Sequence, residues 1–99
     1  MKIVLQWEIH PDRREEVFTA FAGMDLSDYQ VMGGPHVETL GRWHDLINGR
    51  GFSVLETTDP DAITEWMLKW NAAVDFELSI VHDDAEAHAI VRRHVADRG

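Results

Sequence analysis

The stretch EWMLKWNAAVDFELSIV, residues 65–81, joins a helical pattern directly to a strand pattern. Trp66 and Trp70 stand four residues apart, so in a helix of about 3.6 residues per turn both indoles point to one side. From Val74 to Val81, apolar side chains alternate with a set that includes Asp75 and Glu77, as in a half-buried strand. We therefore predict that both indoles are core side chains of a helix packed on a sheet, with a ligand clamp as the alternative.

The same two patterns divide the rest of the chain. Asn48-Gly49 is a strong turn signal for a hairpin, and Pro11 and Pro60 suit the first turn of a helix. A predicted loop at 24–35 closes with the breaker cluster Gly33-Gly34-Pro35. The predicted strands cover residues 2–9, 36–44, 52–57 and 74–81, and the predicted helices begin at Pro11 and Pro60 and cover about 84–98. This order predicts one α+β domain, residues 1–99, a ferredoxin-like βαββαβ sandwich with an extra C-terminal helix.

Two helices cover only one face of such a sheet, so the other face bears on how the chain assembles. Period-2 alternation assigns one uniformly apolar set to the helices: Ile3, Leu5, Trp7, Phe76, Leu78 and Ile80. The opposite face then carries Gln6, Glu8 and Glu77 and, by the same alternation, Leu40, Arg42 and His44. A half-polar face of this kind suits a homodimer whose sheets face each other across a wet cavity.

The composition excludes several classes of protein. With 18 acidic and 9 basic residues the net charge is −9, which opposes binding to nucleic acid and to anionic membrane surfaces. The absence of cysteine excludes disulfides, thiolate nucleophiles and cysteine-based zinc sites. No apolar run approaches membrane-spanning length and no signal-peptide pattern is present, so we expect a soluble, cytoplasmic protein.

Three segments carry a resemblance to a known family: GRWHD (41–45), GFSVLETTDP (51–60) and EWMLKWNAAVDFELSIV (65–81). They resemble an uncharacterised family of short bacterial and archaeal chains, a domain of unknown function, over essentially the whole sequence. The matching positions are Trp43, Glu56-Thr57, Asp59-Pro60, Trp66, Trp70 and Asp75-Phe76-Glu77, and the chain departs from the pattern at His82. The resemblance implies a ferredoxin-like chain that pairs as a dimeric α/β barrel, and it brings no established activity.

The segment Trp43-His44-Asp45 is the sharpest chemical cluster. An imidazole titrating near physiological pH, beside a carboxylate, is the minimum for general acid–base chemistry. Neighbours on a strand point to opposite faces, so we expect the carboxylate partner of His44 to be Glu8 or Glu77 rather than Asp45. His44 is the candidate catalytic residue, and the candidate ligand-binding residues are Gln6, Glu8, Arg42, Trp43 and Glu77.

No cofactor or metal site is expected. Residues 82–88 hold two histidines and three carboxylates, but their spacing matches no metal-binding motif, and an acidic turn that caps a helix is the favoured interpretation. Three functions remain open. The first is a protein that binds a small molecule between the sheets of a homodimer. The second is a cofactor-independent enzyme of monooxygenase or isomerase type that uses His44, and the third is a structural or regulatory interaction module without ligand.

Overall fold

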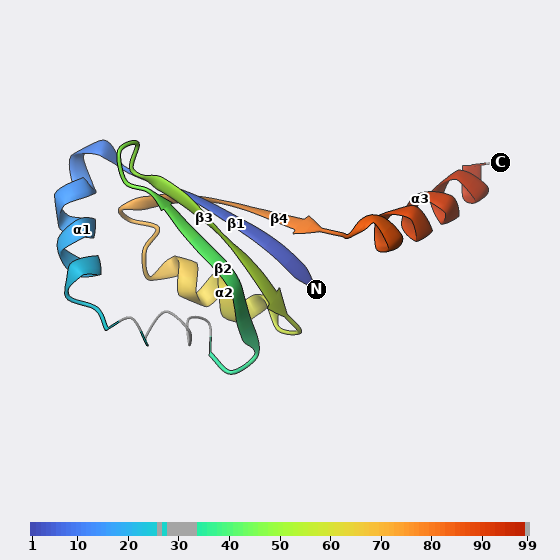
Figure 1. The fold of residues 1–99 in the computed structure, drawn as a ribbon, viewed down its shortest axis with the longest axis horizontal. Coiled ribbons are helices and arrows are strands. Elements are labelled where there is room, and N and C mark those ends of the chain that lie inside the picture. Colours follow the sequence, from blue (N-terminus) through green and yellow to red (C-terminus); the bar gives the residue numbers. More distant parts are fainter. Residues whose placement is uncertain (26, 28–33, 99) are drawn as a thin grey trace.

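The structure, a computed structural model, describes residues 1–25, 27 and 34–98 (Figure 1). In these residues a four-stranded antiparallel sheet, in the order β2-β3-β1-β4, is combined with three α-helices, which confirms the α+β class. The elements are β1 (Lys2–Ile9), η1 (Pro11–Arg13), α1 (Arg14–Ala22), β2 (Val37–Asp45), β3 (Arg50–Thr57), α2 (Pro60–Leu68), β4 (Val74–Val81) and α3 (Asp84–Arg98). Every predicted helix and strand is present, whereas most of the predicted loop 24–35 lies outside the described residues.

The main core lies between α2 and the centre of the sheet. Ile3, Leu5 and Ile63 are each 1% exposed, so β1 and α2 meet in a fully dry contact. Trp66 packs against this cluster, and Trp70 packs against a second cluster formed around Ile9, Ala73 and Val74. The indoles are therefore core side chains, as their spacing predicts, and each is only half-buried. Burial of an aliphatic side chain such as Ile3, Leu5 or Ile63 contributes roughly 1.5–3 kcal/mol to the free energy of unfolding.

The edge strand β4 is covered less completely than the centre of the sheet. Leu78 pairs with Leu5 and Ile80 pairs with Ile3, so the four side chains share the face that the helices cover. The predicted apolar face is therefore correct in composition. However, Leu78 is 40% and Ile80 56% exposed, because the helices pack on the centre of the sheet and on the start of β4, and neither residue belongs to a core cluster.

The C-terminal helix α3 extends away from the sheet in the direction of β4 and gives the molecule its long axis of 54 Å (Figure 1). Its start is fixed by a capping box: the Glu86 amide donates to Asp83 Oδ1 at 2.8 Å, and the Asp83 amide donates to Glu86 Oε1 at 3.2 Å. The acidic turn is thus a helix cap, as expected. All residues of α3 except Ala87 are exposed.

Candidate functional site

A β-bulge at Leu40 decides which side chains reach the helix-covered face of the sheet. Thr39 pairs with Leu55 and Gly41 with Val54, so Leu40 is an extra residue without an opposite partner. One extra residue reverses the facing of everything that follows it in the strand. The prediction that Arg42 and His44 lie on the open face is therefore wrong: Arg42 pairs with the buried Ser53, on the helix side.

The bulge brings Arg42 and His44 into a pocket between the sheet and the helices, here called the inner pocket. Its volume is about 80 Å³, several times the roughly 10–15 Å³ that one water needs. Its walls are mainly apolar and aromatic, and come from β1, α1, β2, the β2–β3 turn, α2 with the segment that follows it, and β4. The residues that line it are Trp7, Ile9, Val17, Phe18, Phe21, Met24, Arg42, His44, Asp45, Leu46, Gly49, Arg50, Trp66, Trp70, Val74 and Phe76.

Arg42 carries a positive charge on the wall of the inner pocket. Its guanidinium carbon lies 5.2 Å from the ring centroid of Trp7 and 5.5 Å from that of Trp66, within the range of cation–π attraction. Trp7 can lie this close to the sheet because Gly51 is opposite it, where a Cβ atom would stand 2.4 Å from the indole. The indoles of β1 and α2 thus hold the guanidinium in place.

His44 stands at the rim of the inner pocket, in edge contact with two aromatic rings. Its ring centroid is 4.9 Å from that of Phe21 and 5.4 Å from that of Trp7. The residue remains largely exposed, but these contacts desolvate part of the ring. Burial, and secondly the charge of Arg42, lower the pKa of His44 below its ordinary value. Both effects favour the neutral imidazole, the form that can accept a proton.

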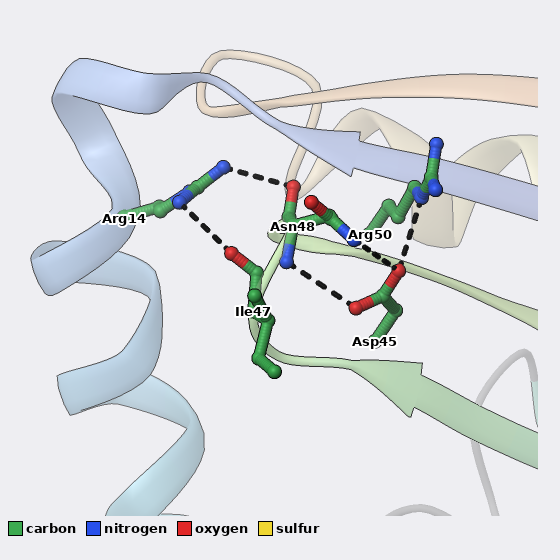
Figure 2. A network of polar contacts seen from close by, with 5 residues as sticks. All are labelled: Arg14, Asp45, Ile47, Asn48 and Arg50. Atoms are coloured by element: carbon green, nitrogen blue, oxygen red, sulfur yellow. Dashed lines mark hydrogen bonds and ion pairs between the residues drawn. The ribbon is translucent and has the colours of Figure 1, made fainter.

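The end of the inner pocket is held by a polar network around the β2–β3 turn (Figure 2). Asp45 accepts hydrogen bonds from the Asn48 side chain at 2.9 Å and from Arg50 Nε at 3.1 Å, and these lower the pKa of its carboxyl group. Arg14 of α1 donates to the Asn48 carbonyl at 2.8 Å. Gly49 has φ +66°, and a Cβ atom there would lie 2.4 Å from Arg14 Nε, so the turn requires glycine. The network ties α1 to the hairpin.

The other predicted ligand-binding residues lie on the opposite, open face of the sheet. Strand register places Glu77, Gln6, Phe52 and Trp43 in one cross-strand row, and Asp75, Glu8, Arg50 and Asp45 in the next. Both rows border a wide hollow of about 730 Å³, here called the outer hollow. Trp43 is 54% and Phe52 42% exposed, and their rings stack at 5.1 Å.

The structure thus divides the predicted site in two. Gln6, Glu8, Trp43 and Glu77 line the outer hollow and Arg42 lines the inner pocket, whereas His44 borders both. The expectation that Glu8 or Glu77 partners His44 is wrong, because they point to the other face. Trp7 is predicted as core, and Trp66 as core with a ligand clamp as the alternative; their contacts with Arg42 are not predicted. The sequence does contain one signal for the bulge, Gly41, since an isolated glycine within a strand often marks one.

Across residues 1–25, 27 and 34–98, no three histidine, aspartate or glutamate side chains are grouped so as to hold a metal ion. Among the helices of that same part of the chain, none has the length and apolar character needed to cross a bilayer.

Comparison with known proteins gives one match. The model of a protein family described as a domain of unknown function, DUF3303, matches residues 1–95. No curated protein and no solved structure matches the chain.

Proposed function

Since the chain belongs to the DUF3303 family, a domain of unknown function, we propose from its own geometry that it binds a small, largely apolar molecule with an anionic group in the inner pocket. The observation that carries the proposal is the guanidinium of Arg42, held by two indoles in a mainly apolar wall, whose other arginine, Arg50, is paired with Asp45. Small-molecule sites combine apolar walls with a few fixed polar groups in this way. The apolar part of the ligand would contact Phe21 and Trp70, and its acid group would lie near Arg42.

A matched set of probes tests the charge preference. Benzoate, benzamide and benzamidine share one ring and carry a negative, neutral or positive group. We expect benzoate to stabilise the chain most and benzamidine least. At a concentration tenfold above Kd, a ligand adds about 1.4 kcal/mol, which raises the melting temperature of a domain this size by roughly 6–10 °C.

Two variants make the result specific to the inner pocket. Arg42→Met keeps a side chain of similar length and removes the charge, so the preference for benzoate is expected to disappear. Arg93→Met removes an exposed arginine of α3, which does not line the inner pocket, and the preference is expected to persist. Equal shifts for the three probes, or a preference for benzoate that survives in Arg42→Met, would contradict the proposal.

We also propose a ferredoxin-like homodimer in which the open face of the sheet meets a second copy. The β1-α1-β2-β3-α2-β4 order supports the ferredoxin-like assignment. The exposed stack of Trp43 and Phe52 supports a partner on the open face, since exposed aromatic clusters are typical of protein interfaces. Light scattering of the purified chain tests the homodimer, and a monomer at micromolar concentration would remove it.

An enzyme that transfers a proton is the second candidate function. It is favoured by the neutral imidazole of His44 at the pocket rim, close to a cation that would stabilise a developing anion. The test is incubation in D₂O with an acid that stabilises the wild-type chain. Carbon-bound deuterium in that acid, absent with His44→Gln, supports the enzyme. Binding without any exchange supports the binding protein alone.

A further inference from the structure

The helix α3 is the part of the chain that its own fold leaves without burial. An isolated helix of 12–15 residues is marginal in water, and α3 has 15 residues, none of them buried. Its three largest aliphatic side chains, Ile90, Val91 and Val95, lie within about 140° of the helix circumference, an arc that His94 and Arg98 share, and they are 39%, 56% and 59% exposed. They are here called the stripe, and covering them would remove exposed apolar surface from water.

The open face of the sheet is the complementary surface by shape. The outer hollow is bordered by the exposed stack of Trp43 and Phe52. A helix of 15 residues is about 22 Å long, and a strand of eight residues is about 26 Å long, so α3 fits along the face. Helices that lie in a groove through an apolar stripe are a recurrent mode of recognition.

Charge favours the same pairing. The open face holds the acidic side chains Glu8, Glu38, Asp45, Glu56, Asp75 and Glu77 against the basic Lys2 and Arg50. Residues 88–99 hold three arginines and one aspartate, so the end of α3 is a basic segment in a chain of net charge −9. A basic helix over an acidic face reduces the repulsion between two like-charged copies.

The helix does not lie on its own open face: it points away from the sheet beyond the end of β4 (Figure 1). Two residues, His82 and Asp83, separate β4 from α3, and the capping box of Asp83 and Glu86 fixes where the helix starts. In this arrangement the surface available to α3 is that of another molecule. A two-fold pair allows each copy to give a helix and to receive one.

We infer that α3 of one copy lies across the open sheet face of a second copy, with its Ile90, Val91 and Val95 stripe over Trp43 and Phe52. The inference rests on the homodimer proposed above and is independent of the ligand in the inner pocket. The exposed parts of these five side chains, counted twice for a two-fold pair, amount to about 1,000 Å², the least area expected of a specific interface.

Substitutions in the full-length chain test the stripe. Val91→Glu combined with Val95→Glu is expected to turn the dimer into a monomer in size-exclusion chromatography with light scattering. The matched control is Ala89→Glu with Ala96→Glu, which adds the same charge to exposed positions on the opposite side of α3 and is expected to leave the dimer intact. A dimer in the first variant, or a monomeric wild-type chain, would overturn the inference.

Cross-linking places the helix, because the native chain has no cysteine. Gln6→Cys lies at the centre of the open face, and Val91→Cys lies on the stripe. When the two variants are mixed, a short bismaleimide is expected to join Gln6→Cys to Val91→Cys. Products formed only within the Gln6→Cys variant would show sheet against sheet, which keeps the homodimer and overturns the place of α3. Products formed only within the Val91→Cys variant would show helix against helix and overturn it as well. Benzoate shifts in these variants report on the inner pocket separately.

Discussion

Replacing Arg42 by methionine removes a charge from between two indoles and leaves most of the side-chain volume. A cation–π contact contributes about 0.5–1 kcal/mol at exposed sites and about 2 kcal/mol when it is desolvated. Arg42 is half-buried and makes two such contacts, at 5.2 and 5.5 Å. Methionine retains apolar contact with Trp7 and Trp66, and its sulfur offsets part of the loss. We expect the free energy of unfolding to fall by about 1–3 kcal/mol.

Guanidinium chloride unfolding, followed by tryptophan fluorescence, measures this change. Arg50→Met is the control, because Arg50 makes an exposed ion pair with Asp45 at 3.1 Å, and exposed pairs contribute about 0–1 kcal/mol. An NMR titration of the His44 ring adds a second readout. Loss of the Arg42 charge is expected to raise the pKa of His44, but not to its ordinary value, because burial is the larger cause of the shift.

Two results would refute the account of Arg42. The first is an Arg42→Met variant that loses no more stability than Arg50→Met, which would mean that the indoles do not stabilise the charge. The second is an unchanged or lower pKa of His44 in Arg42→Met, which would mean that the guanidinium does not act on the imidazole.

Three further predictions concern the fold around the site. Because the pKa of His44 is lowered in the folded chain, the contribution of His44 to stability is complete above the unfolded pKa near 6.5 and is lost as the pH falls through the folded pKa. His44→Gln should therefore reduce the slope of melting temperature against pH in this range, and an unchanged slope would contradict the prediction. Deletion of Leu40 removes the bulge and should lower the melting temperature by several degrees, whereas Leu40→Ala, at a 49% exposed position, should have little effect; equal effects would argue against the register described. Gly49→Ala should cost more in denaturant unfolding than Gly34→Ala, since both have positive φ but only Gly49 approaches Arg14; equal losses would exclude that contact as the cause.

The sequence predicts the elements and the core well because both depend on local periodicity. The alternation in residues 74–81 reports which face each side chain takes, and the spacing of Trp66 and Trp70 reports a shared helix face; Val74, Phe76 and both indoles join the core clusters as expected. The cap at the start of α3 was also predictable, since a capping box involves only residues 83–86. Each of these features is decided within a few residues of chain.

The division of the candidate site could not be predicted from periodicity alone. A period-2 pattern assumes an unbroken strand, and Leu40 breaks it, so Arg42 and His44 exchange faces with Trp43. The support that Trp7 and Trp66 give to Arg42 depends on that exchange and on contacts between β1, β2 and α2. The incomplete cover of Leu78 and Ile80 is likewise set by where α2 lies on the sheet, which no local pattern reports.

The bulge at Leu40 also affects how relatives of this chain should be aligned. In a relative whose strand lacks the extra residue, an ungapped alignment pairs Arg42 and His44 with residues that face away from the helices. The residues next to them in that strand would face the helices instead. Along residues 41–45, the same alignment column would then describe opposite layers of the molecule. A one-residue gap at Leu40 restores the correspondence, and it belongs in the alignment before any inner-pocket residue is transferred between relatives.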